Sequence, residues 1–457
     1  MSPNLSQFAL ISSLLMNWDG IRLRMEPISP ELADELSKIA ARLQGADSAD
    51  EIANALDDLL DLTRGTAAYT YLQGLAGRSV MLDISSTRDY EVRTISEGPS
   101  LLTNDVGTGS DSGSGQGDDA AAMAIEGSRV LGTLISVESD IARVPIFFAT
   151  NRAKAANLDT PFSGEPAGEI FYGMAPVTIP VDKHRIGHVE SPHWWNLFPN
   201  KDKEHRFVLL EGLEPLTQSA FATQLETLLQ SAYAKDLLVF LHGYNVTFEE
   251  GARRAAQIAY DMTFPGAVIL FSWPSAGSAM AYAKDEERAF ASADRFAAFL
   301  KSLEGGPWNR VHVMAHSMGN RVMLLGLADN QRPKLPLGQI VLTAADVYIP
   351  LFEEKFPKLQ GAGRLPTTSY ASNRDLALWL SSQLHRGPRV GLISGEPFVA
   401  PQLDTIDASA VDTGFLGHGY FSEKRSLITD LRLLLYSSLT PKDRGLTAAK
   451  NYWLFPK

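Results

Sequence analysis

The 457-residue chain contains no cysteine. Without thiols it can form no disulfide and no thiolate nucleophile, and it cannot hold a metal through cysteine. It also lacks any apolar run near the roughly 20 residues that a membrane-spanning helix needs. The apolar stretch at residues 8–16 has neither a basic segment before it nor a small-residue cleavage site, so it is a poor signal peptide. These absences predict a cytoplasmic protein with no transmembrane segment.

Basic residues are also scarce. The chain has 41 Lys and Arg residues but 53 Asp and Glu residues, which gives a net charge of −12. Residues 1–122 hold only 8 of the basic but 19 of the acidic residues, so the excess lies almost entirely in this front segment. Nucleic-acid binding requires a basic face, so we expect no nucleic-acid partner. The acidic front could recruit a basic protein partner or simply keep the chain soluble.

Signatures of bound cofactors are missing as well. The sequence contains neither a P-loop nor the glycine fingerprint of a dinucleotide site. His184, His188 and His193 are spaced H-x3-H-x4-H, and paired histidines can hold zinc. No H-E-x-x-H pattern accompanies them, and a glycine and a proline interrupt any helix there. We therefore predict no metal and no cofactor, and we expect these histidines to line a cleft beside Trp194 and Trp195.

Composition divides the chain into three parts. Residues 104–122 are dominated by Gly, Ser and Asp, cannot bury apolar surface and predict a flexible linker. Residues 1–103 before the linker form an acidic, partly helical region, in which capping signals and apolar spacing predict a helical hairpin from Leu32 to Leu59. Residues 123–457 after it are long enough for one large α/β domain.

Short apolar runs separated by helical patterns follow the linker. They predict strands at residues 144–150, 171–180, 206–210, 237–241, 267–271, 311–314, 339–342 and 368–370. The runs from residue 237 onward do not alternate with polar residues, so both faces of each strand should be buried. This pattern is typical of a mostly parallel central sheet covered by helices.

Residues 315–319 read Ala-His-Ser-Met-Gly and lie between an apolar strand and a helical pattern. A serine on such a sharp strand-to-helix turn is the nucleophile elbow of a serine hydrolase. The positions two before and two after the serine must be small, because the strand and helix backbones nearly touch there. Gly319 meets this need, and Ala315 replaces the usual glycine. We therefore predict Ser317 as a nucleophile, with a serine that only caps the following helix as the alternative.

Serine catalysis also needs a histidine that takes the hydroxyl proton. In this fold class the chain order is serine, then acid, then histidine, and only His385 and His418 follow Ser317. His418 is flanked by glycines and precedes a predicted closing helix at residues 426–437, so we predict it as the base. His385 follows the helical pattern of residues 375–384 and fits a residue at a helix C-terminus.

Two aspartates compete for the role of the acid that holds this histidine. Asp375 follows the predicted strand at residues 368–370, and Asp346 follows the strand at residues 339–342. The loop after the later strand is the commoner site of the acid, so Asp375 is the first choice. Asp346 is the alternative acid, and whichever of the two is not the acid could cap a helix or orient the cleft.

The oxyanion hole is expected to combine two backbone N–H groups. One belongs to Met318, directly after the nucleophile, and the other to the loop after the strand at residues 237–241. That loop reads His-Gly-Tyr-Asn, and Gly243 permits a tight backbone approach. We predict the N–H of Tyr244 as the second donor. His242 precedes the serine and should brace this loop rather than act as the base.

Several motifs together resemble the bacterial DUF900 family of uncharacterised α/β-hydrolases. They are Val-Phe-Leu-His-Gly-Tyr-Asn at 239–245, Ser-Trp-Pro-Ser at 272–275, Ala-His-Ser-Met-Gly-Asn at 315–320, Gly-His-Gly-Tyr-Phe at 417–421, and the lead-in Phe-Ala-Thr-Asn-Arg at 148–152. The similarity spans roughly residues 143–437. It implies an α/β-hydrolase fold and a triad of Ser317, Asp375 and His418.

These residues together predict a cofactor-independent serine hydrolase that cleaves carboxylic esters of small molecules or lipids through an acyl-enzyme. A lipase, thioesterase, amidase or acyltransferase could use the same triad, because the acyl pocket decides between them. Trp273 and Tyr282 could line that pocket or pack in the core. A non-catalytic scaffold on a hydrolase fold is the alternative from a different class, since a fold alone never establishes activity.

Overall fold

The computed structural model of the chain describes most of the region after residue 132. The described residues are Asp34, Lys38, 128–129, 133–138, 140–155, 161–187, 189, 208–277, 281–329, 332–361, 364–411 and 424–456. Asp34 and Lys38 are helical and form an ion pair of 2.8 Å one turn apart. The rest of the predicted N-terminal region and the whole predicted linker lie outside the described residues. No helix in the described part of the chain is both long and apolar enough to cross a membrane.

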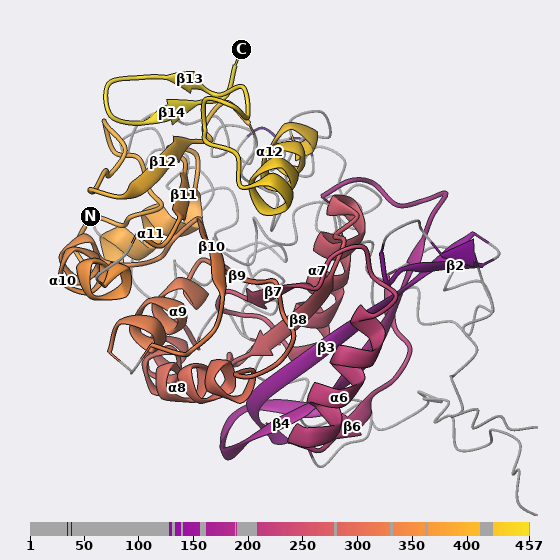
Figure 1. Cartoon of the computed structure of the whole chain (residues 1–457). Helices are drawn as coiled ribbons and strands as arrows, with labels where there is room; N and C mark the ends of the chain where they lie inside the picture. The colour runs from indigo at the N-terminus through magenta and orange to yellow at the C-terminus, as the bar shows by residue number, and fades with distance from the viewer. Residues whose placement is uncertain are drawn as a thin grey trace, which may run out of the picture.

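One large sheet organises the molecule (Figure 1), with the strand order β1-β2-β3-β8-β7-β9-β10-β11-β12-β14-β13. Its middle strands are β3 (Ile141–Lys154), β8 (Ala267–Ser272), β7 (Asp236–Leu241), β9 (Arg310–His316), β10 (Leu337–Thr343), β11 (Thr367–Ala371) and β12 (Leu403–Asp407). Neighbouring strands in this set pair in parallel. Every residue of β7 and β8 is buried, which explains why their sequences do not alternate. The predicted mostly parallel sheet is confirmed here.

The front edge of the sheet is antiparallel, which the sequence does not predict. β4 (Phe162–Pro180) pairs antiparallel with β3, and β5 (Leu209–Leu210) and β6 (Glu214–Leu216) pair with β4. β1 (Ser128–Arg129) and β2 (Ser136–Glu138) extend this edge. The run at 171–180 reads as continuously apolar because both faces of β4 are covered. Tyr172 packs in one core cluster, while Val177 and Ile179 pack in the other.

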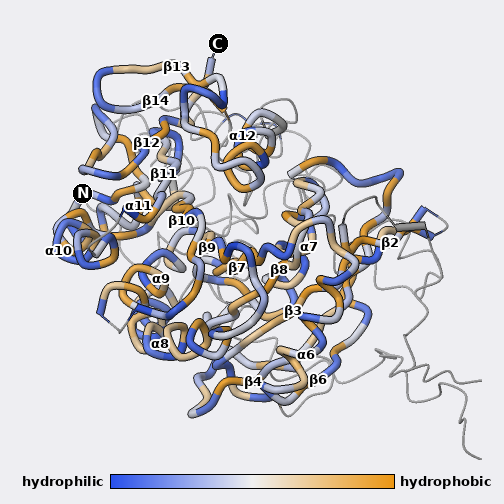
Figure 2. Tube along the Cα trace, in the orientation of Figure 1, coloured by the Kyte–Doolittle hydropathy of each residue, from blue (hydrophilic) through white to orange (hydrophobic). Residues whose placement is uncertain are grey.

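Helices cover both faces of the sheet. α6 (Gln218–Leu229), α8 (Tyr282–Ser302), α9 (Gly319–Ala328), α10 (Ile349–Gln360) and α11 (Leu376–Leu384) contribute to one core cluster, and α7 (Phe248–Met262) and α12 (Lys424–Ser437) to the other. Figure 1 shows α8, α9 and α10 on one side of the strands and α7 and α12 on the other. β3 and β8 lie between these two layers of helices, and buried hydrophobic residues occur along both strands (Figure 2). The α/β-hydrolase architecture is therefore confirmed for the described residues.

The strand β12 is absent from the sequence prediction, because polar residues at 404, 405 and 407 interrupt its apolar pattern. It pairs with β11 near the end of the sheet, where half-exposed aspartates are tolerated. β14 (Trp453–Leu454) and β13 (Thr447–Ala448) complete that edge. β12 matters for the site because the segment that contains His418 follows it.

The strand order reverses between β7 and β9. β8, which follows β7 in sequence, pairs on one side of β7, while β10, β11 and β12 lie beyond β9 on the other side. In open parallel sheets, ligands bind outside the carboxyl ends of the strands at such a switch point. The carboxyl end of β7 leads into His242, and that of β9 leads into Ser317. The topology therefore brings these two loops to the position where a ligand site is expected.

Candidate active site

Ser317 occupies the turn between β9 and α9 with a φ of 50°, a left-handed conformation that is unfavourable for a residue with a side chain. Hydrogen bonds hold its backbone on both sides. Its N–H donates to the carbonyl of Thr343 at 3.0 Å, and its carbonyl accepts from the N–H groups of Asn320 at 3.1 Å and Asp346 at 3.2 Å. The loop after β10 therefore helps to keep this turn in its strained form.

Gly319 shows why the elbow needs small residues. A Cβ atom at this position would lie 2.4 Å from the carbonyl oxygen of His242 and 3.0 Å from that of Leu241. Contacts this short do not occur, so any side chain would push α9 away from the end of β7. Ala315, two residues before Ser317, is fully buried, and its methyl group fits.

The loop after β7 lies against Ser317. A Cβ atom on Gly243 would lie 3.1 Å from the Cβ of Ser317 and 3.0 Å from Nδ1 of His316. Tyr244 follows as a buried residue, and Met318 begins α9 on the other side of the serine. The two N–H groups predicted for the oxyanion hole therefore belong to segments that both border Ser317.

A buried arginine of β3 supports this loop. The guanidinium of Arg152 donates to the carbonyl oxygens of Val246 and Ser275, both at 2.7 Å, and to Oγ of Ser272 at 2.8 Å. Burial lowers the pKa of Arg152 to about 10, so it still carries its charge at neutral pH. The sequence predicts no role for Arg152, although this residue ends the Phe-Ala-Thr-Asn-Arg motif at 148–152 and directly follows an apolar run.

His242 has contacts with the same loop. Nη2 of Arg152 donates to its Nε2 at 3.2 Å, and its Nδ1 lies 2.8 Å from the carbonyl oxygen of Gly243. Its ring stacks on the fully buried Trp273, with centroids 5.2 Å apart. Burial and the charge of Arg152 hold the pKa of His242 well below its usual value, so the ring is neutral. Trp273 therefore packs in the core rather than in a pocket.

Asp285 of α8 holds the loop from another direction. Its Oδ2 accepts from the N–H of Asn245 at 3.1 Å and from Oγ of Ser275 at 2.6 Å, and its Oδ1 accepts from the N–H of Ala276 at 2.8 Å. Burial raises the pKa of this carboxyl group. Asn245 has a φ of 55°, so the loop has a second left-handed residue close to Ser317. Arg152 and Asp285 thus fix the backbone that would present an oxyanion donor.

Asp346, the alternative acid, is already engaged by four side chains. Its carboxylate accepts from the hydroxyls of Tyr282 at 2.5 Å and Ser381 at 2.6 Å, and it forms ion pairs of 3.2 Å with Arg321 and Arg389. Burial works against the charge, but the two arginines keep the pKa of Asp346 below its usual value. The buried Tyr282 is therefore also a core residue with a polar partner.

Asp375, the first-choice acid, has a different environment. It is the N-cap of α11, and its Oδ1 accepts from the N–H of Leu378 at 2.9 Å. Burial, with a smaller contribution from the charge of Asp346, raises the pKa of Asp375 to about 6. A carboxylate with a raised pKa is one that a nearby imidazole could stabilise.

His418 lies outside the described residues, so its place beside Ser317 stays a prediction. The chain that leads to it is described as far as Val411. After β12, the N–H of Ala408 donates to the carbonyl of Ala371 at 2.8 Å, and Oγ of Ser409 accepts from the N–H of Asn373 at 2.9 Å. The chain therefore leaves the sheet beside the loop that carries Asp375.

Two other histidines have acidic partners. Nε2 of His385, at the C-terminus of α11 as predicted, lies 2.8 Å from Oε2 of Glu286. Nε2 of the buried His184 lies 2.6 Å from Oδ1 of Asp261. His188, His193 and the neighbouring tryptophans are not among the described residues. In the part of the chain that the structure describes, no three potential metal ligands come together.

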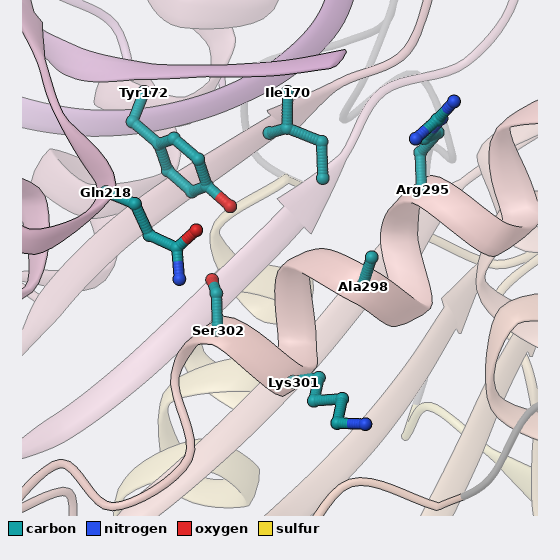
Figure 3. A pocket seen from close by; sticks show the side chains of 7 residues that line it. All are labelled: Ile170, Tyr172, Gln218, Arg295, Ala298, Lys301 and Ser302. Carbon is teal, nitrogen blue, oxygen red and sulfur yellow. The ribbon is translucent and has the colours of Figure 1, made fainter. Parts of the chain in front are cut away.

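A hollow of about 390 Å³ lies between β4, the start of α6 and the second half of α8 (Figure 3). Its lining residues are Ile170, Tyr172, Gln218, Arg295, Ala298, Lys301 and Ser302. Figure 3 shows the hydroxyls of Tyr172 and Ser302 pointing toward one another. Another hollow, of about 370 Å³, is lined by residues between 382 and 394. Ser317 is not among the residues that line either hollow.

Comparison with protein families finds one matching model, described as an alpha/beta hydrolase of unknown function (DUF900), over residues 217–435. The match begins at the N-cap of α6, ends within α12 and includes both Ser317 and Asp375. No curated protein matches the chain.

Three solved structures are similar over large parts of their lengths. Poly(3-hydroxybutyrate) depolymerase LpqC from Bordetella parapertussis has 14% identity and a TM-score of 0.26, covering 46% of this chain and 83% of its own. Inhibited esterase B from Lactobacillus rhamnosis has 10% identity and a TM-score of 0.29, covering 68% and 91%. Wild-type AbyA5 has 11% identity and a TM-score of 0.27, covering 94% and 85%. Similarity this low carries no conclusion about chemistry.

Proposed function

We propose that the protein is a serine hydrolase that cleaves carboxylic esters, since residues 217–435 match the model of the DUF900 family of α/β-hydrolases. Ser317 is its nucleophile, His418 its base and Asp375 its acid. The observation that carries the proposal is the strained turn of Ser317, with a φ of 50° and the glycine loop of Gly243 directly against it. Strain at a serine that borders two loop segments is typical of a functional site.

The reaction runs through an acyl-enzyme. His418 takes the hydroxyl proton of Ser317 while the oxygen attacks the ester carbonyl carbon, and the carbonyl electron pair moves onto its oxygen. The N–H groups of Met318 and Tyr244 stabilise this oxyanion. The intermediate collapses, the alcohol leaves with the proton from His418, and water then repeats the sequence and releases the acid.

Asp375 holds and orients His418 in this proposal. Its support is the position of Asp375 beside the point where the chain leaves β12, together with the raised pKa of its carboxyl group. An imidazole that donates to this carboxylate would stabilise its charge. Asp346 is the poorer candidate because four side chains already occupy its oxygens.

Lipases, thioesterases, amidases and acyltransferases share every step up to the acyl-enzyme, so they remain alternatives within the same chemistry. They differ in the leaving group and in the acceptor that releases the acyl group. A scaffold without catalysis shares the fold but forms no acyl-enzyme. Turnover of graded substrates therefore separates the classes.

The test is hydrolysis of p-nitrophenyl esters from acetyl to lauryl. Ser317→Ala is expected to lower kcat/KM by at least about 10³-fold, because the hydroxyl is the reacting group. Ser438→Ala is the matched control, since Ser438 also has a φ of 50° but bonds through its hydroxyl to Arg310, at the opposite end of β9. Wild-type turnover in a folded Ser317→Ala protein would overturn the proposal. Transfer of the acyl group to an added primary alcohol in preference to water would identify an acyltransferase.

A further inference from the structure

Tyr282, the first residue of α8, touches both loops that border Ser317. Its ring packs edge-on against the ring of Tyr244, with centroids 5.2 Å apart and planes at 68°. Its hydroxyl donates to Oδ2 of Asp346 at 2.5 Å and lies 2.8 Å from Oγ of Ser381. The side chain is only 1% exposed, so the surrounding core holds it in this position.

Asp346 connects Tyr282 to the turn that contains Ser317. Its backbone N–H donates to the carbonyl oxygen of Ser317 at 3.2 Å. Its own carbonyl oxygen accepts from Nε of Arg321, in the first turns of α9, at 2.6 Å. Both backbone polar groups of Asp346, the N–H and the carbonyl, are therefore hydrogen-bonded to residues of the elbow. Its carboxylate accepts a hydrogen bond from Tyr282.

We propose that Tyr282 is a positioning residue of the hydrolase. Its ring fixes the position of the oxyanion loop at Tyr244. Its hydroxyl, through Asp346, fixes the position of the strained turn at Ser317. This inference rests on the proposed role of Ser317 as the nucleophile. The spacing between an oxyanion donor and a nucleophile must stay within a fraction of an ångström of its productive value, and small displacements are costly in rate. A single side chain that contacts both segments is well placed to keep their spacing.

The two contacts of Tyr282 can be separated by substitution. Tyr282→Phe keeps the ring against Tyr244 but removes the hydroxyl from Asp346. Tyr282→Leu removes both contacts. We expect Tyr282→Phe to slow acylation of Ser317 by about tenfold or more with little change in KM, because the positions of reacting groups change while the substrate contacts do not. Tyr282→Leu should slow acylation further.

The chain offers a chemically matched control in Tyr370. Its buried hydroxyl also donates to a buried carboxylate, Oδ2 of Asp430, at 2.5 Å, with Arg444 at 3.5 Å. This pair lies in the other core cluster, where the carboxylate belongs to α12. Tyr370→Phe should lower the unfolding temperature about as much as Tyr282→Phe, because both lose the same type of hydrogen bond. It should leave the acylation rate of Ser317 at the wild-type value.

The experiment measures the rate at which a fluorophosphonate phosphonylates Ser317, kcat and KM for an activated ester, and thermal unfolding, all on the full chain. Slower phosphonylation and slower acylation by the ester in Tyr282→Phe alone support the proposal. Wild-type acylation in Tyr282→Phe, or equal slowing in both Tyr→Phe variants, overturns it. If Tyr282→Phe fails to fold, Ser381→Ala replaces it, because this change also loosens Asp346, and unchanged acylation in that variant overturns the proposal. A wild-type protein without an adduct at Ser317 overturns the proposed function itself, and the role of Tyr282 falls with it.

Discussion

Gly319 packs so closely against His242 that a Cβ atom on the glycine would lie 2.4 Å from the carbonyl oxygen of the histidine. This contact joins the start of α9 to the end of β7, and both segments border Ser317. The elbow and the oxyanion loop are therefore fitted to each other through backbone atoms.

Gly319→Ala is expected to destabilise the protein by about 1–3 kcal/mol and to abolish ester turnover, because the methyl group forces the two segments apart. Urea unfolding and steady-state kinetics measure the two effects. Gly168→Ala is the control, since nothing lies within 4 Å of a Cβ built at that position in β4. Equal behaviour of the two variants would show that the close approach at Gly319 is not needed.

Arg152→Lys tests the buried support of the oxyanion loop. Lysine keeps the charge but cannot reach Val246, Ser275 and Ser272 together, so we expect a loss of about 3 kcal/mol in the free energy of unfolding. Arg143→Lys is the matched control on the same strand, because Arg143 pairs near the surface with Glu138 and Glu211. Its loss should stay within about 1 kcal/mol. A difference of less than 1 kcal/mol between the variants would argue against this support.

Asp375→Asn and Asp346→Asn separate a catalytic carboxylate from a structural one. Asparagine caps a helix as well as aspartate does, so Asp375→Asn should keep its stability and lose about 10³- to 10⁴-fold in kcat. Asp346→Asn removes the carboxylate that pairs with Arg389 and leaves Arg321 paired with Glu286 instead of with two carboxylates, so it should cost about 3–5 kcal/mol of stability. Urea unfolding beside ester kinetics gives both quantities. An active Asp375→Asn enzyme would remove Asp375 from the triad.

His312 predicts a specific loss of stability in acid. It is fully buried on β9, and its Nδ1 accepts from the N–H of Gln339 at 2.9 Å. Burial, with a smaller effect of Arg310, lowers the pKa of His312 to about 3. The unfolded chain binds a proton below pH 6.5 while the folded protein does not, so the free energy of unfolding falls by about 1.4 kcal/mol per pH unit between pH 6.5 and 3.

His312→Asn should remove this part of the pH dependence, because the asparagine oxygen can accept the same hydrogen bond without binding a proton. Urea unfolding of both proteins between pH 7.5 and 4.5 provides the comparison. Below pH 6.5 the free energy of unfolding of the wild type should fall more steeply than that of the variant, by about 1.4 kcal/mol per pH unit. Parallel curves over this range would contradict the neutral state of His312.

The sequence predicts the elbow and the central strands well because their signals are local. A serine between a strand and a helix needs a small residue at 319, and a strand buried on both faces has no polar positions. The support of the site is harder to read from the sequence. Asp346 is contacted by three residues from distant segments of the chain, Tyr282, Ser381 and Arg389. No residue near Asp346 in the sequence indicates that its carboxylate has these partners.

The front of the sheet shows a second limit of sequence patterns. A strand covered on both faces is continuously apolar whether it pairs in parallel or antiparallel, so the direction of β4 has no local signal. β12 is missed for a different reason. Its half-exposed aspartates interrupt the apolar pattern from which a strand would be predicted. Pairing direction and position near an edge are properties of the assembled sheet.

Fluorophosphonate labelling with intact-mass detection and peptide mapping shows whether Ser317 is an activated nucleophile. We expect a single adduct on the wild-type protein, mapped to Ser317, and no adduct on Ser317→Ala. Unchanged labelling of Ser317→Ala, an adduct that maps to another serine, or a folded wild-type protein that never labels would contradict this expectation.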